Sequence, residues 1–380
     1  MSLLEVSDLT VSFPSADGLV QAVRGVTFSV DRGKTLGIVG ESGSGKSVCT
    51  QTLLGLTPGA RISGQAVFEG RDLIGMDAAE LRAVRGARIS TIFQDPLSSL
   101  HPLYKVGWQI TEMIRAHTDM NKKAAGAKAV ELLGMVGIPE PGRRVDDYPH
   151  QFSGGMRQRA LIAMALALDP VLVIADEPTT ALDATVQAQI LELLTRLQRE
   201  LDMSLIMITH DLGVIAGLAD QVLVMYAGQA IEKADVRTTY YRPHHPYTVG
   251  LLESIPSSRA AGERLRPIAG QPPSLIRVPS GCPFHPRCPY VMDRCVEQAP
   301  PLAPVSADDA VQNGHLSACW LPGDLLGTSD ETAASRTATA DARRSDSARR
   351  LADAIIHAPE INSASIVAAH LGAQSAEESQ

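Results

Sequence analysis

The sequence has no apolar run long enough to cross a bilayer. Its longest uninterrupted apolar stretch is the nine-residue segment Ala160–Leu168, whereas a membrane-spanning helix needs roughly 18 such residues. The chain also begins directly with strand-like alternation, whereas a secretory signal would begin with a charged start followed by an apolar segment. These absences predict a chain that spans no membrane and stays in the cytosol.

Positive charge is also in short supply. The 34 Lys and Arg residues are outnumbered by 42 Asp and Glu residues, which gives a net charge of −8. The basic residues form no stripe along the sequence. Proteins that bind nucleic acid neutralise its phosphates with clustered basic side chains, so we expect no nucleic-acid partner.

Cysteine is scarce and unevenly placed. Cys49 stands alone inside a predicted helix and is expected to be a small core residue. Cys282, Cys288, Cys295 and Cys319 are spaced C-x5-C-x6-C-x23-C. In a reducing compartment, clustered cysteines are more often metal ligands than disulfides. The tight pairs typical of structural zinc sites are absent, so the spacing favours an iron–sulfur cluster over zinc, with unligated thiols as a third alternative.

Strand and helix signals alternate through the first part of the chain, which is typical of a parallel sheet covered by helices. Apolar, β-branched segments predict strands at 20–30, 36–39 and 171–175. A helix is expected from Lys46 to the breaker Pro58.

Three other regions differ from this alternation. Between residues 96 and 168 the apolar residues follow helical spacing, which indicates an inserted helical lobe. Residues 257–320 are rich in Pro, Arg and Cys and predict a small, loop-rich extension. Residues 321–380 contain no aromatic residue and much Ala and Ser, so we expect a largely disordered tail.

A glycine-rich loop with the pattern G-x-x-x-x-G-K-S lies between a predicted strand and a predicted helix. Its glycines let the backbone wrap a phosphate chain, and the helix start adds its positive end. Lys46 is expected to reach the β- and γ-phosphates. Ser47 is expected to bind Mg²⁺, which Asp176 would hold from the other side. An ordinary glycine turn is the alternative, but it explains neither Lys46-Ser47 nor the strand that ends in Asp176. The residues expected to bind the nucleotide here are Gly40, Ser42, Gly43, Ser44, Gly45, Lys46 and Ser47.

Two further segments suit phosphate chemistry. Glu177 directly follows Asp176 and can orient or activate the water that attacks the γ-phosphate, with a solvated acidic cap as the alternative. Ser153, Gly154 and Gly155 precede a helix predicted to begin at Met156. They therefore present a hydroxyl, open backbone amides and a helix dipole to a second phosphate.

The order of these segments resembles the nucleotide-binding subunit of an ATP-binding cassette (ABC) transporter, over roughly residues 3–256. The resemblance implies an α/β P-loop NTPase fold, with a RecA-like lobe and a helical lobe inserted at about 96–168. It also implies an ATP-hydrolysing motor with ATP and Mg²⁺ as cofactors. The segments that carry it are the loop at 40–47, Gln94, Phe152–Met156, Val171–Glu177 and His210.

The resemblance implies roles for residues that would have none by themselves. Gln94 would sense Mg²⁺ and the γ-phosphate, and His210 would contact the same phosphate and steady Glu177. Phe13 would stack on adenine, although a strand phenylalanine can also be plain core. In the family two subunits stack head to tail, so that each ATP lies between one phosphate loop and the other subunit's Ser153–Gly155 segment. Asp183 resembles the loop that crosses this interface.

The C-terminal part narrows the resemblance to dipeptide and oligopeptide importer ATPases. Met156, where Gln is frequent in the wider family, is usual in that branch. Members carry a [4Fe–4S] cluster in the extension, which implies Cys282, Cys288, Cys295 and Cys319 as its ligands, with zinc as the alternative. The segments that resemble the branch are His245–Thr248, Leu251–Pro256, Gly270–Leu275 and Gly281–Pro289.

The branch also implies partners. These are a second, different cassette ATPase, two membrane permeases and an extracytoplasmic substrate-binding protein, with this chain at the cytoplasmic face of the membrane. Peptide is the expected cargo, and nickel, glutathione and some sugars are alternatives.

Two other functions fit less well. Cassette ATPases that act on ribosomes or DNA usually carry two cassettes or a long coiled coil between the phosphate loop and Ser153, and this chain has one cassette and about a hundred residues there. A regulatory cassette with a dead site is disfavoured because Lys46, Asp176, Glu177 and His210 are all present.

Overall fold

The structure is a computed structural model that describes residues 2–180, 182–255, 268–306 and 314–322. The tail expected at 321–380 therefore lies outside the described residues, apart from its first two. The chain forms two compact units. One consists mainly of residues 75–208. The other consists mainly of residues 4–29, 36–74 and those from 209 onward.

The 75–208 unit contains three parallel strands. β6 (Ile89–Ile92) pairs with β7 (Leu172–Asp176), and β7 pairs with β8 (Ser204–Thr209). Every residue of β7 and β8 is buried, as is typical of parallel strands covered on both faces. The strand predicted at 171–175 is confirmed with a shift of one residue.

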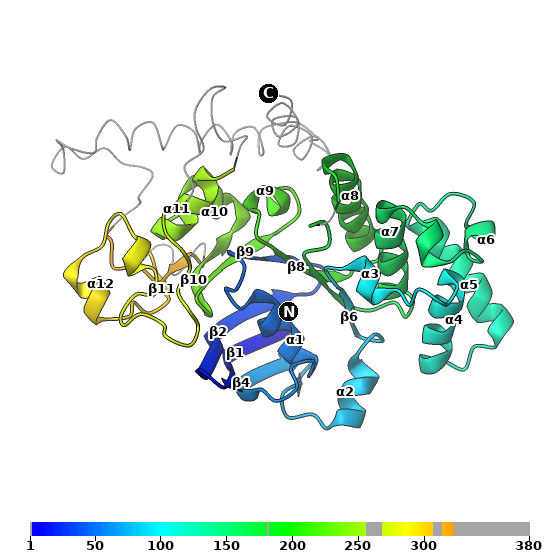
Figure 1. Ribbon diagram of the computed structural model, residues 1–380, viewed down its shortest axis with the longest axis horizontal. Helices are drawn as coiled ribbons and strands as arrows, with labels where there is room; N and C mark the ends of the chain where they lie inside the picture. Colours follow the sequence, from blue (N-terminus) through cyan, green and yellow to red (C-terminus); the bar gives the residue numbers. More distant parts are fainter. Residues whose placement is uncertain (1, 181, 256–267, 307–313, 323–380) are drawn as a thin grey trace. The chain divides into compact units, whose positions relative to one another are not determined.

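Helices make up the rest of this unit (Figure 1). The helical character predicted for 96–168 is confirmed, and α4, α5 and α7 pack against one another there. The helices are α2 (Ala78–Val84), α3 (Pro96–Ser99), α4 (Val106–His117), α5 (Lys122–Met135), α6 (Pro141–Arg144), η1 (Pro149–Gln151), α7 (Gly154–Ala165) and α8 (Ala184–Glu200).

The other unit contains strands of two sheets. One sheet has the order β2-β1-β4-β5. In the other, β3 pairs in parallel with β9, and β10, β12 and β11 follow in antiparallel pairing. The strands are β1 (Ser2–Ser15), β2 (Gly18–Asp31), β3 (Thr35–Val39), β4 (Arg61–Phe68), β5 (Arg71–Asp72), β9 (Gln221–Tyr226), β10 (Gln229–Asp235), β11 (Ala303–Pro304) and β12 (Leu316–Ser317).

The helices of this unit are mostly short. α1 starts at Lys46 as predicted but ends at Leu53 rather than near Pro58. The reason is local, because Gly55 adopts a φ of +60°, the left-handed conformation that commonly ends a helix. The helices are α1 (Lys46–Leu53), α9 (Leu212–Ile215), α10 (Val236–Tyr241), α11 (Pro246–Glu253), η3 (His285–Arg287) and α12 (Asp293–Glu297).

The C-terminal extension adds strands to the edge of a sheet. β12 pairs with β10 through Glu232↔Ser317 and Lys233↔Leu316, and β11 pairs with β12. The sequence predicted a loop-rich extension and no strands at these positions. Strands of two residues have no periodic pattern from which they could be recognised.

A buried carboxylate lies where the extension meets β10. Glu232 is fully buried, and its carboxylate accepts hydrogen bonds from the backbone N–H groups of His244 (2.7 Å) and His245 (3.0 Å). The ring Nε2 of His315, in the extension, lies 2.8 Å from the same carboxylate. Burial alone would raise the pKa of Glu232, but the hydrogen bonds from His315 and from the backbone N–H of His244 outweigh burial and lower this pKa. The ionised carboxylate thus joins the extension to β10 and to the start of α11.

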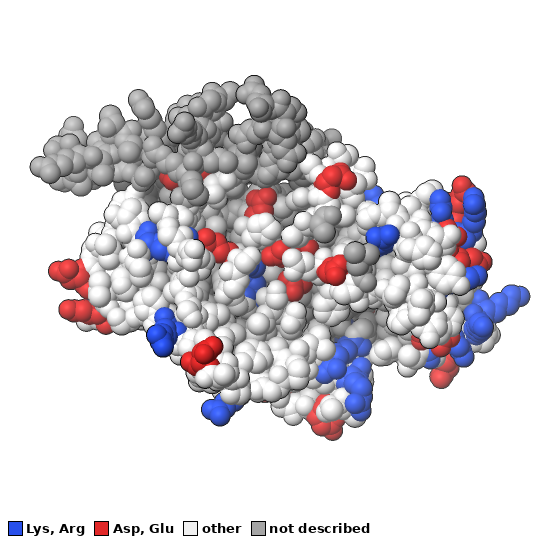
Figure 2. Space-filling view, in the orientation of Figure 1, with Lys and Arg blue, Asp and Glu red and all other residues white. Residues whose placement is uncertain are grey.

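Exposed ion pairs contribute little to the stability of the helical part. Acidic and basic residues are interspersed on the face shown in Figure 2, and pairs such as Lys105–Asp146 (2.8 Å) are largely exposed. Exposed ion pairs contribute about 1 kcal/mol or less.

Of the helices that the structure describes, none combines the length and the apolar character of a membrane span.

The turn between β3 and α1 depends on two glycines. Gly40 and Gly45 have φ values of +159° and +96°. A Cβ atom at position 40 would overlap the backbone carbonyl of Met225, and one at position 45 would overlap that of Ala22. The backbone therefore passes too close to its neighbours for any side chain at these two positions.

Gly45→Ala is expected to destabilise the fold more than Gly59→Ala. Both glycines have positive φ, but nothing lies within 4 Å of a Cβ at Gly59. Gly59→Ala should therefore cost only the backbone strain, about 1–2 kcal/mol. Gly45→Ala adds the overlap with Ala22, roughly 1–3 kcal/mol more. Urea unfolding of both variants measures the difference, and equal losses would contradict the close approach.

Candidate nucleotide site

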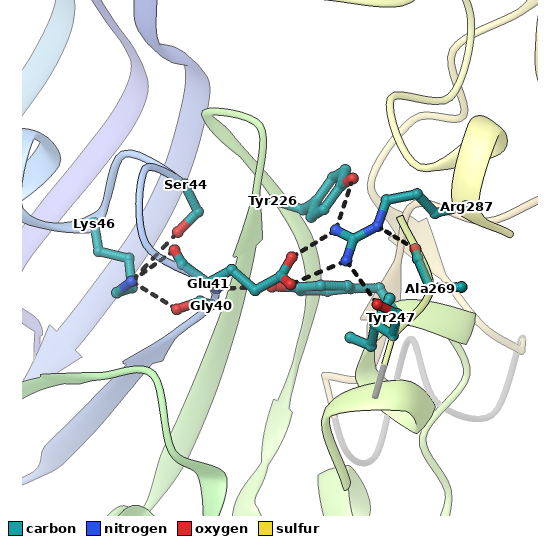
Figure 3. Close-up of polar contacts among 9 residues, drawn as sticks. Gly40, Glu41, Ser44, Lys46, Tyr226, Tyr247, Ala269 and Arg287 are labelled. Carbon is teal, nitrogen blue, oxygen red and sulfur yellow. Dashed lines mark hydrogen bonds and ion pairs between the residues drawn. The ribbon is translucent and has the colours of Figure 1, made fainter. Parts of the chain in front are cut away.

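The phosphate loop is the turn of residues 40–45 that follows the buried strand β3. Lys46 begins α1 and is only 5% exposed. Its ammonium donates to the carbonyl oxygens of Gly40 (2.6 Å) and Glu41 (3.0 Å) (Figure 3). No side chain caps the start of α1, where Gly45 is the N-cap residue. The turn, the helix start and the ammonium together have the chemistry of a polyphosphate site. The predicted residues in this segment are Gly40, Ser42, Gly43, Ser44, Gly45, Lys46 and Ser47.

Three residues that the sequence interpretation did not select contact one another at this loop. The backbone N–H of Glu41 donates to the Tyr247 hydroxyl (2.8 Å), and the Arg287 guanidinium pairs with the Glu41 carboxylate (2.7 Å). Tyr247 and Arg287 lie inside segments that resemble the peptide-importer branch, which was the available signal. Glu41 occupies a variable position of the glycine-rich pattern, so the pattern gave no signal for it.

In the 75–208 unit, two of the predicted catalytic residues lie together. The Gln94 side-chain amide donates to Glu177 Oε2 (3.2 Å), and Thr180 Oγ1 donates to the same oxygen (2.8 Å). Glu177 has a φ of +46°, a strained conformation for a residue with a side chain, and such strain is common at functional sites. Asp176 ends β7 and is 5% exposed.

The Ser153–Gly155 segment begins α7, two residues earlier than predicted. Ser153 Oγ accepts a hydrogen bond from the Met156 N–H (3.3 Å). Gly155 is needed for packing, because a Cβ there would lie 2.7 Å from Val186 Cγ1 of α8. Asp183 caps α8 by accepting from the Val186 N–H (3.0 Å).

Phe13 and His210 belong to the same unit as the phosphate loop. Phe13 is half-buried in β1, and His210 is exposed directly after β8. Their roles at adenine and at the γ-phosphate remain predictions.

The four clustered cysteines line one pocket of the extension, together with the rings of Phe284 and Tyr290. Cys282 and Cys295 are buried, and Cys288 and Cys319 are half-buried. Burial raises the pKa of Cys288 to about 11 and that of Cys319 to about 12. Within the described ranges, no three His, Cys, Asp or Glu side chains are grouped so that they could hold a metal ion.

Two protein families match the chain. The ABC transporter family matches residues 23–180, and the oligopeptide/dipeptide transporter C-terminal region matches residues 231–295. The chain is 50% identical to the oligopeptide transport ATP-binding protein OppD of Salmonella typhimurium, over 85% of this chain and 95% of that protein. It is 54% identical to OppD of Bacillus subtilis (84% and 88% covered) and 50% identical to the dipeptide transport ATP-binding protein DppD of the same organism (84% and 94%).

A solved structure matches the cassette part. The ATP-binding cassette MJ0796, in a dimeric post-hydrolysis state bound to ADP and Pi, is 26% identical with a TM-score of 0.56, over 61% of this chain and 98% of that one. The P-loop NTPase fold of an ABC cassette, expected from the sequence, is therefore confirmed. The fold is that of an ABC cassette, and the chain is at least 50% identical to these relatives over most of their length. The chain therefore belongs to the ABC transporter ATP-binding proteins, in the branch of the oligopeptide and dipeptide transport ATP-binding proteins.

Proposed function

We propose that this chain is the ATP-hydrolysing motor subunit of an ABC importer for oligopeptides or dipeptides. The observation that carries the proposal is the 50% identity to OppD across 95% of that protein, which includes the C-terminal region characteristic of oligopeptide and dipeptide transporters. In the same proposal, residues 1–256 form the cassette, 257–320 the extension and 321–380 a tail.

The proposed site binds the nucleotide through the phosphate loop. Lys46 and the amides at the start of α1 bind the β- and γ-phosphates. Ser47, Gln94 and Asp176 would hold Mg²⁺, which supplies positive charge to neutralise the phosphate oxygens when bound. Their hydroxyl, amide and carboxylate oxygens are the hard ligands that this ion prefers.

Glu177 orients the attacking water in this proposal. The hydrogen bonds from Gln94 and Thr180 to one carboxylate oxygen fix the direction of the other, which supports a single orientation of the water. His210 steadies this arrangement at the γ-phosphate, and Phe13 stacks on the adenine.

A dimer completes the proposed mechanism. The serine hydroxyl that accepts from the Met156 N–H still has its own hydrogen to donate to a phosphate oxygen of a second subunit's ATP. The dimeric cassette MJ0796 is the structural precedent. We propose a head-to-tail heterodimer with a second cassette ATPase, with Asp183 at its interface. The dimer would work with two permeases and an extracytoplasmic binding protein, at the cytoplasmic face of the membrane.

Glu177→Gln is expected to keep ATP affinity within about threefold of the wild type and to lower steady-state hydrolysis by a factor of roughly a hundred or more. The phosphate contacts survive, but the amide cannot accept the proton of the water. Phosphate release by the purified complex and equilibrium ATP binding measure the two effects.

Glu131→Gln, an exposed glutamate of α5 in the same unit, is the matched control and should hydrolyse ATP at the wild-type rate. Wild-type turnover in Glu177→Gln would remove Glu177 from the mechanism.

We also propose an iron–sulfur cluster in the cysteine pocket. A single zinc ion requires four ligands at about 2.0–2.3 Å from one centre, whereas a [4Fe–4S] cluster distributes four thiolates over its irons. The four thiols line one pocket of the extension, and their spacing lacks the tight cysteine pairs typical of structural zinc sites, which favours the cluster over zinc. Cys282, Cys288, Cys295 and Cys319 would hold it, and bound iron would keep these thiols ionised in spite of their burial.

Protein purified without oxygen should contain about four irons per chain. Cys288→Ala should lose them, because one ligand is missing. Cys49→Ala should keep them, because Cys49 is fully buried in α1, outside the pocket. Elemental analysis measures both, and stoichiometric zinc without iron would overturn the cluster.

A further inference from the structure

The residue that ties the extension to the phosphate loop is Arg287. It ends the short helix η3, directly before Cys288. Its Nη1 and Nη2 atoms donate to Glu41 Oε2 (2.7 Å) and Oε1 (3.0 Å), a two-bond contact between guanidinium and carboxylate (Figure 3). Glu41 and Arg287 are 246 positions apart in the sequence, so this contact exists only because the extension folds back onto the loop.

Every donor of the Arg287 guanidinium is used. Besides the two bonds to Glu41, it donates to the carbonyl oxygens of Ala269 (2.9 Å) and Ile268 (3.3 Å) and to the Tyr226 hydroxyl (3.3 Å). Its side chain is 5% exposed. A guanidinium held by five hydrogen bonds cannot reorient without leaving donors unsatisfied, so it presents a fixed charge to Glu41.

Glu41 is held on all its polar groups. Its carboxylate pairs with Arg287, its N–H donates to the Tyr247 hydroxyl (2.8 Å), and its carbonyl accepts from the Lys46 ammonium (3.0 Å). Burial raises the pKa of Tyr247, so this hydroxyl keeps its proton. The contacts from Arg287 and Tyr247 come from outside the loop, and they hold the side chain and the backbone N–H of the second residue of the turn.

Arg287 offsets an unfavourable negative charge that Glu41 places in the phosphate loop. A carboxylate in a loop that binds a polyphosphate repels the ligand, because like charges at short range disfavour one another. Arg287 neutralises that carboxylate from the side of the extension. Loss of Arg287 would leave a loop that is both less fixed and more negative.

We propose that Arg287 is a positioning residue of the nucleotide site, which holds and neutralises Glu41 so that the C-terminal extension sets the affinity of the phosphate loop for ATP. This inference rests on the proposed function, because it requires that the loop binds ATP.

The test is a double-mutant cycle on the full-length chain, with ATP binding measured at equilibrium without Mg²⁺ so that hydrolysis does not proceed. Arg287→Ala should weaken ATP binding roughly tenfold, which corresponds to about 1.4 kcal/mol. Adding Glu41→Gln should recover at least about threefold of that loss, because the uncompensated charge is removed. Arg277→Ala, an exposed arginine of the same extension, is the control and should bind ATP like the wild type.

A purely structural role would lower the thermal unfolding temperature of Arg287→Ala without these changes in affinity. Wild-type ATP affinity in Arg287→Ala, or no recovery in the double variant, would therefore overturn the proposal.

If Arg287→Ala does not fold, Arg287→Lys and Tyr247→Phe decide. Each removes part of the contact to Glu41 and should weaken ATP binding about threefold, and wild-type affinity in both would overturn the proposal. A wild-type chain that binds no ATP would overturn the proposed function as well.

Discussion

The close approach of the backbone at Gly40 and Gly45 to the carbonyl groups of Met225 and Ala22 is the constraint on which the nucleotide site depends. It forces the chain to reverse between β3 and α1 with fixed directions for each peptide group. Two carbonyls of the turn face the Lys46 ammonium, and the Ser44 carbonyl is held by the N–H of Gly228 (3.0 Å). A phosphate is bound by the N–H ends of peptide groups fixed in this way, because flexible amides would have to be ordered at the expense of affinity.

Parts of the fold with a local pattern could be predicted from the sequence. The continuous apolar runs of β7 and β8, the helical spacing of 96–168 and the start of α1 all follow from neighbouring residues. The contacts of Glu41 could not be predicted, because Tyr247 lies 206 positions away and Arg287 lies 246. No periodicity connects such residues, and single side-chain contacts leave no trace in composition. The early end of α1 is a different case. Gly55 could have predicted it, but the helix was expected to continue to the breaker Pro58.

Two side chains proposed for the dimer interface are also helix caps. Ser153 caps α7 and Asp183 caps α8, each through one hydrogen bond to a backbone N–H. An N-cap residue has an extended backbone and lies at the positive end of its helix. A side chain there is already oriented by its own helix, so a contact to a second subunit costs little additional ordering.

The pairing of β12 with β10 bears on how the chain could be divided or recombined. A chain cut before residue 268 would keep Glu232 and Glu41 but lose His315 and Arg287, their partners in the extension. One of these carboxylates is fully buried. The remainder would be a cassette in which each of these two carboxylates has lost one of its partners. Cassette and extension are therefore not interchangeable parts, and an exchange between relatives has to move both members of each pair together.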